Sequence, residues 1–208
     1  MQVNLISWTQ SPEHKSLKDL VVYVARVSNP RSQERGSDTS RLWNYLQRHG
    51  HWSPFEMADV TLEIVCTRDI SRQILRHRSF SFQEFSQRYS SPLEHLNFTF
   101  REARLQHDTN RQLSLPADDQ KLQEAWVAQQ ARVKDVSISA YQWALDNGIA
   151  KEQARAVLPE GLTETRLYMK GSLRSWLHYF EVRCGPDTQE EHRAIAKEAQ
   201  KIIWELIN

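Results

Sequence analysis

The chain has 208 residues and a formal net charge of +1. This length is typical of one globular domain, so we expect residues 1–208 to form a single domain. The near-neutral charge argues against a surface that binds nucleic acid or anionic membrane as a whole, and no apolar run in the sequence is long enough to cross a bilayer. Hydrophobic residues make up 39% of the chain, below the ~45–50% usual for a globular domain, so we expect subunit contacts or a large bound cofactor to complete the interior.

Alternation of apolar and polar residues predicts strands, and apolar residues three or four positions apart predict helices. The helix expected after the second strand places Gln73 and Arg76 side by side. In the first half of the chain these patterns predict, in order, a strand at 3–8, a helix at 17–27, an exposed loop at 28–37, a helix carrying Leu42, Trp43 and Leu46 that ends at Gly50, a strand at 60–66, a helix carrying Ile70, Ile74 and Leu75, and a strand at 96–100.

The second half of the chain is richer in predicted helix. The patterns predict a long helix at 117–147, a short helix that ends at 158–159, a strand at 162–169, a helix at 173–182, and a last helix that begins at Asp187 with a capping box completed by Glu190. Strands separated by helices, without a glycine-rich phosphate loop, predict an α+β fold and argue against a dinucleotide-binding Rossmann unit. We expect a mixed sheet flanked by helices, with the long helix at the centre.

The two cysteines indicate a reducing compartment. Cys66 and Cys184 allow at most one disulfide and lack the Cys-x-x-Cys spacing of a metal site, so we expect a cytoplasmic protein. Cys66 falls on the apolar side of a strand, which predicts an inert core thiol, whereas Cys184 beside Arg183 predicts a lowered thiol pKa. The histidines show no zinc-ligand spacing, so no metal site is predicted.

An arginine-rich stretch lies in the middle of the chain. Residues 68–111 contain eight arginines and no lysine, and the segment 76–89 contains Glu84 as its only acid. Three guanidinium groups gathered in one pocket repel one another unless an anion neutralises them, and a phosphate-bearing ligand is the simplest such anion. Serine hydroxyls and the side chains of Gln83 and Glu84 add groups that can hydrogen-bond a nucleobase.

Two other interpretations of this stretch stay open. Phe80, Phe82, Phe85 and Tyr89 lie among the arginines, as on a single-stranded nucleic-acid platform where bases stack on aromatic rings. The stretch also matches a solvated basic loop at a helix end. The alternation of Phe80 and Phe82 is typical of core packing, and the near-zero net charge gives no general nucleic-acid footprint.

The segment that begins at Arg76 resembles the signature of flavin-dependent thymidylate synthases. That signature is Arg-His-Arg, seven residues and then Ser, with Glu two residues before this Ser and Arg-Tyr two residues after it. The matching residues are Arg76-His77-Arg78, Ser81, Gln83-Glu84, Ser86 and Arg88-Tyr89. The resemblance extends to His49-Gly50-His51, Ser53-Pro54-Phe55-Glu56, residues 154–159, Thr165-Arg166, Arg174, His178 and Arg183, and so covers the chain from about His49 to its C-terminus.

This resemblance implies an enzyme that methylates dUMP to dTMP. The carbon would come from 5,10-methylenetetrahydrofolate, and the hydride from FAD that NADPH recharges. The fold of the family is α+β, with active sites at the subunit interfaces of a homotetramer, which agrees with the low hydrophobic fraction of this chain. Neither a nucleic-acid nor a membrane partner is implied.

The resemblance also implies roles for individual residues. Arg183 would be the catalytic residue, because a permanent positive charge beside the uracil ring stabilises its N3-deprotonated, enolate-like form. The dUMP pocket would consist of Gln73, Arg76, Glu84, Phe85, Ser86, Gln87, Arg88, Arg183 and, from another subunit, Arg155. FAD would contact Ser53, Glu56, Arg76, His77, Arg78, Gln83, Glu84, Ser172, Arg174 and His178, with His51 near the approach of folate or nicotinamide.

Two positions depart from the family pattern. Ser172 stands where the family commonly has Asn, and Asp187 stands where it commonly has His, so a carboxylate at position 187 is expected to alter the affinity for FAD. Two roles also have simpler structural alternatives. Arg155 has the i,i+3 spacing of a surface partner for Glu152, and Arg183 has the position of a helix C-terminal cap.

Overall fold

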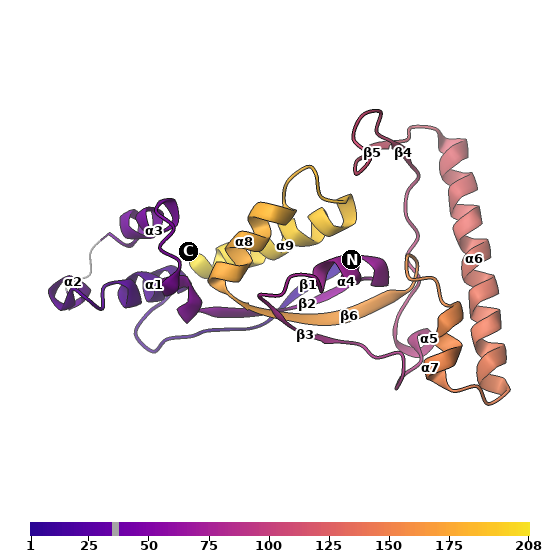
Figure 1. The fold of residues 1–208 in the computed structure, drawn as a ribbon, viewed down its shortest axis with the longest axis horizontal. Coiled ribbons are helices and arrows are strands. Elements are labelled where there is room, and N and C mark those ends of the chain that lie inside the picture. Colours follow the sequence, from indigo (N-terminus) through magenta and orange to yellow (C-terminus); the bar gives the residue numbers. More distant parts are fainter. Residues whose placement is uncertain (35–37) are drawn as a thin grey trace.

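The computed structural model describes residues 1–34 and 38–208 of the chain. Its elements are, in chain order, β1 (Gln2–Trp8), α1 (Leu17–Ala25), α2 (Pro30–Glu34), α3 (Thr39–Arg48), η1 (Ser53–Met57), β2 (Asp59–Thr67), α4 (Arg68–Ile74), β3 (Ser81–Glu84), α5 (Pro92–His95), β4 (Arg104–Gln106), β5 (Ser114–Pro116), α6 (Gln120–Asp146), α7 (Lys151–Ala154), η2 (Arg155–Val157), β6 (Glu164–Ser172), α8 (Leu173–Arg183) and α9 (Glu190–Ile207). Helices α8 and α9 lie over a central sheet, α1 to α3 lie at one end of an elongated molecule, and α6 lies at the other (Figure 1).

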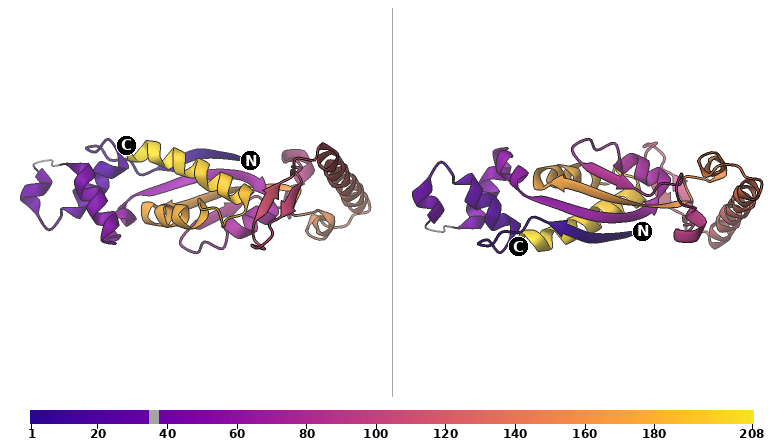
Figure 2. Two further views of the ribbon diagram at one scale, coloured as in Figure 1. Left: turned by 90° about the horizontal axis from the view of Figure 1, so that it is seen from above. Right: turned by 90° about the horizontal axis from the view of Figure 1, so that it is seen from below.

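Within the described residues, the central sheet has four strands in the order β1-β2-β6-β3, and every pair is antiparallel. Strands β2 and β6 pair without interruption from Asp59 opposite Ser172 to Thr67 opposite Glu164. Along β2 every second residue is buried, as the alternation predicts for a sheet with one covered face. Seen from below in Figure 2, the strands lie in front of α8 and α9, so both helices cover the same face.

Helix α8 is fixed to this face by its aromatic residues. Trp176 and Tyr179 are fully buried, and the indole nitrogen Nε1 of Trp176 donates a hydrogen bond of 3.1 Å to the carbonyl oxygen of Val60. Phe80 packs edge-on against Trp176, with ring centroids 4.8 Å apart. Burial of large aromatic side chains contributes strongly to core stability, so α8 and the turn that carries Phe80 are held together.

The predicted α+β class is confirmed, and most predicted elements occur close to their expected ranges. Two features of the expected architecture differ. The sheet is antiparallel throughout rather than mixed, and the long helix α6 lies at one end of the molecule rather than at its centre (Figure 1). Periodic apolar residues indicate that a helix has an apolar face, but they do not indicate which part of the fold covers that face.

The strand expected at 96–100 is wrong. Around it, an isolated bridge joins Phe98 to Thr163, and the Glu164 carboxylate accepts hydrogen bonds from the Asn97 backbone and the Thr99 hydroxyl. The Asn97 N–H, which a longer ladder would pair with a backbone carbonyl, is thus bound by a side chain, so backbone pairing is limited to the bonds that flank the bridge. The fourth strand of the sheet is instead β3, within the arginine-rich stretch, and it pairs with β6. The hairpin of β4 and β5 was also not predicted.

Two further boundaries differ from the sequence prediction. The loop expected at 28–37 contains the short helix α2, and its residues 35–37 lie outside the described part of the chain. The last helix begins at Glu190 rather than Asp187, and its N-cap Gln189 makes no side-chain capping bond, so the predicted capping box is wrong. Both Glu190 and Glu191 in its first turn instead pair with Arg104, because that guanidinium reaches the helix from β4.

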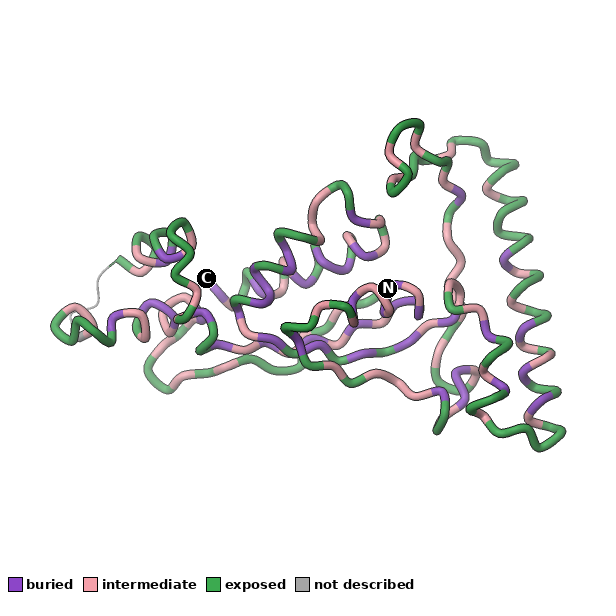
Figure 3. The backbone as a smooth tube through the Cα atoms, in the orientation of Figure 1, coloured by how far each residue is buried: buried purple, intermediate pink, exposed green. Residues whose placement is uncertain are grey.

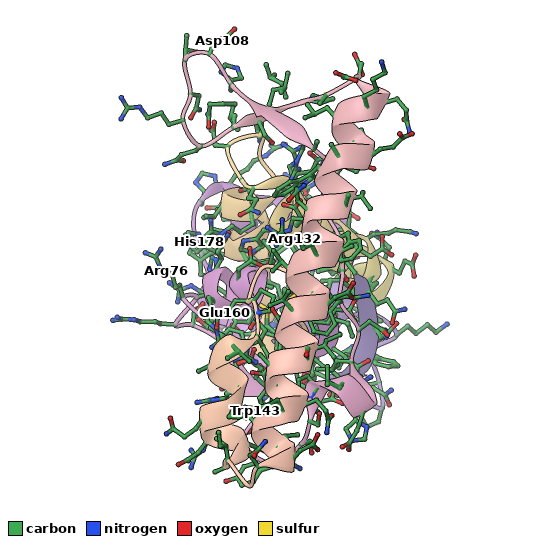
Figure 4. The ribbon with its side chains drawn as sticks, turned by 90° about the vertical axis from the view of Figure 1, so that its right-hand side faces the viewer. Arg76, Asp108, Arg132, Trp143, Glu160 and His178 are labelled. Carbon is green, nitrogen blue, oxygen red and sulfur yellow. The ribbon has the colours of Figure 1, made fainter. Side chains whose placement is uncertain are left out.

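Helix α6 leaves much of its apolar surface uncovered. Much of the helix is coloured as exposed in Figure 3. Trp143 is 63% exposed, and Val136 and Trp126 are also exposed. Figure 4 looks directly onto this helix and shows Trp143 on its outer part, with no described segment in front of it. Although α6 has 27 residues, no described helix combines the length and the apolar composition that crossing a membrane requires.

We expect Gly171→Ala to destabilise the fold by about 1–3 kcal/mol, as overpacking of a core does. A Cβ atom at position 171 would lie 2.5 Å from the buried Phe80 ring, which Trp176 prevents from moving away. Urea unfolding at a fixed protein concentration measures the loss. Gly161→Ala is the matched control, because nothing lies within 4 Å of its added Cβ, and equal destabilisation by the two substitutions would contradict the explanation.

Candidate active site

Polar side chains from α4, the turn that follows it, α8 and α9 meet where these elements approach one another. We call Gln73, His77, Tyr179, Arg183 and His192 the imidazole cluster. Arg183 is the last residue of α8, and its Nε donates a hydrogen bond of 2.9 Å to Nε2 of His77. His192 lies 3.0 Å from the Tyr179 hydroxyl through Nε2 and 3.2 Å from Oε1 of Gln73 through Nδ1. The fold thus brings together three predicted site residues, Gln73, His77 and Arg183.

Both histidines of this cluster are held neutral. Burial, followed by the charge of Arg183, lowers the pKa of His77 to about 4, and the same two causes lower the pKa of His192 to about 3. A neutral His77 can present the lone pair of Nε2, so it accepts the Arg183 hydrogen bond without repelling the guanidinium. The terminal nitrogens of Arg183 have no hydrogen-bond partner among the described residues, and they are therefore available to a ligand.

A cleft of about 450 Å³ lies along α8 from Arg174 to Glu181, and its lining residue His178 is close enough to His77 to affect the pKa of that ring. Its lining residues are Trp52, Glu56, Ser79, Arg174, Ser175, His178 and Glu181. Arg174 and Glu56 form an ion pair of 2.9 Å across this cleft, and a hydrogen bond from Ser172, followed by Arg174, lowers the pKa of Glu56. Four predicted flavin residues are therefore neighbours: Glu56, Ser172, Arg174 and His178. Figure 4 shows His178 and Arg76 on the same side of the molecule.

Glu84 lies in a second polar cluster under α4. Its carboxylate accepts hydrogen bonds from Ser71 at 2.7 Å, from Thr165 at 3.1 Å and from Arg72 at 3.1 Å. Arg68 approaches the same carboxylate at 3.8 Å. The only acid of the signature segment thus neutralises arginines from α4, and its predicted contacts with dUMP and FAD stay a prediction.

Arg88 and Arg155 lie in a third place, beside α7. The Nε atom of Arg88 is 3.8 Å from the Glu152 carboxylate, and Nε of Arg155 donates a hydrogen bond of 3.2 Å to the backbone carbonyl of Glu152. The i,i+3 alternative for Arg155 is thus a bond to the backbone and not to the carboxylate. Because α7 and η2 lie beside α6, away from the end of α8 (Figure 1), one chain does not bring Arg155 and Arg183 into one cavity.

The remaining predicted site residues occupy varied surroundings. Phe85 continues the pairing of β3 through a hydrogen bond from its backbone nitrogen to Arg166, the Ser86 hydroxyl accepts from the Arg88 backbone nitrogen, and Gln87 is buried with its Nε2 unpartnered. The side chains of His51, Ser53, Arg76, Arg78 and Gln83 are exposed. The exposed His51 ring stands edge-on to Tyr45, with centroids 5.7 Å apart.

The nucleic-acid interpretation is not supported. Phe80 is buried in the core between Trp176 and Tyr179, so its ring faces are not available to stack on bases. Phe82 packs against the same core. Of the four aromatic residues that suggested a platform, Tyr89 alone is largely exposed, and a single exposed ring does not form a stacking surface.

The thiols agree with the sequence prediction at one position and contradict it at the other. Cys66 is buried, and burial raises its pKa to about 12, as expected for an inert core thiol. Cys184 was expected to have a lowered pKa because of Arg183. Burial instead raises its pKa, since the thiol packs against the core beside α9.

Sequence reasoning missed several residues that complete the cluster. Tyr179 and His192 are fully buried, and Gln189 and Glu191 continue the hydrogen bonds from Gln73. One signal was present in the sequence, because His192 has the spacing of the apolar residues Ile195 and Ala199 and therefore lies on the buried face of its helix. The partners of this histidine come from helices distant in sequence, so no local pattern identifies them.

The geometry of the site indicates the class of ligand that the protein binds. A guanidinium held by a neutral imidazole, beside a cleft lined by Arg174 and His178, is suited to an anionic ligand that carries a ring. A family model described as thymidylate synthase complementing protein matches residues 5–207. The chain belongs to the family of flavin-dependent thymidylate synthases.

Individual relatives match nearly the whole chain. The flavin-dependent thymidylate synthase of Synechocystis sp. is 51% identical, and the probable flavin-dependent thymidylate synthase of Paramecium bursaria Chlorella virus 1 is 44% identical; each match covers 98% of this chain and 94% of the relative. A solved structure of the UMP/dUMP methylase PolB from Streptomyces cacaoi, bound with 5-Br dUMP, is similar with a TM-score of 0.81 and 28% identity, over 99% of this chain and 90% of that one.

Burial of His192 as a neutral ring makes stability depend on pH. Its folded-state pKa of about 3 lies below the ~6.5 of a histidine in an unfolded chain, so unfolding takes up a proton between these values and stability falls as the pH falls. We expect His192→Asn to reduce the proton uptake on unfolding by about one proton. The slope of the unfolding free energy against pH should then fall by ~1.4 kcal/mol per pH unit at roughly pH 4 to 6.

Urea unfolding at successive pH values measures this slope. His95→Asn, at an exposed position, controls for the loss of a histidine from the unfolded chain. An unchanged slope in the His192 variant would show that the ring is not buried in its neutral form.

Proposed function

We propose that this protein methylates dUMP to dTMP, taking the carbon from 5,10-methylenetetrahydrofolate and the hydride from FAD that NADPH reduces. The observation that carries this proposal is the pairing of Arg183 with a neutral His77, since it leaves a charged guanidinium open to a ligand. The alternative as a single-stranded nucleic-acid-binding protein has no comparable support. A single domain over residues 1–208 and a cytoplasmic location belong to the same proposal.

The cleft beside α8 fits a flavin nucleotide in its chemistry. Its volume of about 450 Å³ lies within the range of small-molecule sites, roughly 300–1,000 Å³. Arg174 and His178 supply donors for phosphate or ring carbonyl oxygens, and Trp52 supplies an aromatic wall. The residues that would hold FAD are Ser53, Glu56, Ser172, Arg174 and His178, with Arg76, His77, Arg78, Gln83 and Glu84 from the signature segment. Bound there, FAD would supply the hydride that completes the methyl group.

Arg183 would activate the pyrimidine. Uracil is a poor carbon nucleophile, and a positive charge beside the ring stabilises the enolate-like form that carries more electron density at the carbon to be methylated. A guanidinium does not lose its proton near neutral pH, so Arg183 acts as a fixed charge and not as a base. His77 holds the guanidinium in one orientation, because its Nε2 lone pair accepts the Nε–H bond.

The co-substrates would approach on the side of η1. His51 lies next to Trp52 and is edge-on to Tyr45, and its ring is 6.2 Å from that of His49. A group of partly exposed aromatic and imidazole rings is suited to stacking on a flat ring such as a pterin or a nicotinamide. We propose that folate or NADPH reaches the flavin past His51.

The dUMP pocket would be shared between copies of the chain. Gln73, Arg76 and Arg183 lie at the α4 and α8 side, whereas Arg155 lies at the α6 end with Arg88. We propose a homotetramer in which Arg155 of one copy enters the site of another, and in which the exposed apolar residues of α6 are covered by a further copy. Glu84, Phe85, Ser86 and Gln87 would complete the pocket.

We expect Arg183→Ala to lower dTMP formation by a factor of about 10² to 10³, the usual cost of removing one group that stabilises developing negative charge. Flavin should remain bound, because Arg183 does not line the cleft beside α8. Steady-state assays with NADPH and methylenetetrahydrofolate, together with a flavin absorption spectrum, measure both quantities. Arg41→Ala, on the exposed side of α3, is the control.

Two results would distinguish an error in the role of Arg183 from an error in the proposed function of the protein. Full turnover of the Arg183 variant would remove this residue from catalysis. Absence of dTMP from the flavin-loaded wild-type protein would refute the function itself.

We expect two inactive variants to restore activity when they are combined. Arg155→Ala and Arg183→Ala each damage every site of their own oligomer. If one site takes these two residues from different copies, random reassembly gives intact sites in about a quarter of cases. Co-expression with two purification tags, followed by assay of the doubly tagged fraction, tests this. Recovery no greater than the sum of the separate variants would place both residues in one copy.

A further inference from the structure

A chain of side-chain hydrogen bonds runs through the buried part of the imidazole cluster to the first turn of α9. The Tyr179 hydroxyl meets His192, His192 meets Gln73, and Nε2 of Gln73 donates to Oε1 of Gln189 over 2.7 Å. Nε2 of Gln189 then donates to Oε2 of Glu191 over 2.9 Å. We call these five residues the amide relay. Outside Gln73, none of them has a role in the reaction described above.

The Glu191 carboxylate, at one end of the relay, determines which residue donates and which accepts in the bonds of Gln189 and Gln73. Glu191 is paired with Arg104, and a carboxylate has lone pairs but no proton to donate. Gln189 must therefore turn its NH₂ group toward Glu191, which leaves its carbonyl oxygen facing Gln73. Gln73 must in turn direct its NH₂ group at that oxygen, so its own carbonyl oxygen faces His192.

The other end of the relay, formed by His192 and Tyr179, is compatible with either direction of hydrogen-bond donation. A neutral histidine can carry its proton on either ring nitrogen, and a tyrosine hydroxyl can donate or accept. With both amides reversed, His192 would accept from Gln73 at Nδ1 and donate to Tyr179 from Nε2, and every bond from Gln189 to Tyr179 would still be made. Among the relay residues, the Glu191 carboxylate alone excludes this reversed arrangement.

Gln73 lies close to the group that would act on the pyrimidine. Arg183 contacts His77 and Gln73 contacts His192, and the two imidazole rings are 6.3 Å apart. An amide uses one N–H and one carbonyl lone pair in the relay, which leaves a second N–H and a second lone pair for a ligand. Reversal of the Gln73 amide would exchange the positions of this free N–H and this free lone pair, so their positions depend on the orientation that Glu191 imposes.

We propose that Glu191, acting through Gln189, sets the orientation of the Gln73 amide and so selects uracil over cytosine in the bound nucleotide. This inference rests on the proposed function, in which Arg183 borders the base and Gln73 belongs to the same dUMP pocket, and it places the Gln73 amide against the base as well. Uracil presents an accepting oxygen at position 4 and a donating N3–H, whereas cytosine presents a donating amino group and an accepting N3. An amide of fixed direction matches one of these edges, and an amide that can reverse matches both.

The test compares the affinities of the flavin-loaded protein for dUMP and dCMP by isothermal titration calorimetry. We expect Glu191→Gln to narrow the preference for dUMP by about tenfold, because a glutamine can donate as well as accept and so allows the relay to reverse. Glu190→Gln is the matched control. Glu190 also pairs with Arg104 but makes no bond to Gln189, so this variant should keep the wild-type preference.

A second variant tests the same inference if Glu191→Gln does not fold. Gln189→Met keeps the pair of Glu191 with Arg104 but removes the amide that connects it to Gln73, and it should narrow the preference in the same way. An unchanged preference in whichever of these variants folds would overturn the inference while leaving the proposed function intact. Equal narrowing in Glu190→Gln would also overturn it, because the cause would then be the charge near Arg104. Absence of dUMP binding to the wild-type protein would instead refute the proposed function.

Discussion

The hydrogen bond between the Arg183 guanidinium and the neutral His77 ring is the contact on which the candidate site depends. This bond requires a neutral imidazole, since a protonated ring would repel the guanidinium and would offer no lone pair, and the lowered pKa of His77 keeps the ring neutral over a wider pH range. Burial is the main cause of that neutrality, and burial is provided by the aromatic side of α8. The packing of Trp176 and Tyr179 on the sheet thus places Arg183 and also sets the electrostatics around it.

The sequence predicts the secondary structure of this fold well where a pattern is long. Strands β2 and β6 alternate over nine residues and occur within three residues of their predicted bounds, whereas β3 has four residues and was missed. The segment 96–100 has the alternation of a strand, but the Glu164 side chain takes the Asn97 N–H that would extend the pairing beyond the bridge of Phe98 with Thr163. Where a side chain competes with backbone pairing, periodicity alone gives the wrong answer.

The candidate site was predictable as a set of residues but not as an arrangement. The signature residues are neighbours in sequence, yet Glu84 turns toward α4, Arg88 turns toward Glu152, and His77 turns toward Arg183. The resemblance to a known family supplied their identity. The separation of His77 from Arg88 follows from the fold, because β3 runs along the edge of the sheet between these two residues. His192 was missed because its partners come from α4 and α8.

The distribution of charge explains which cations remain for a ligand. Of the three guanidinium groups in the signature segment, Arg88 has a distant acid nearby, whereas Arg76 and Arg78 have no ion pair within the described part of the chain. Glu56 pairs with Arg174, and Glu152 lies near Arg88. Arg183 differs from these, because its partner is a neutral ring. A hydrogen bond to an imidazole fixes the direction of the guanidinium without cancelling its charge, so positive potential is retained where a nucleotide base is proposed to bind.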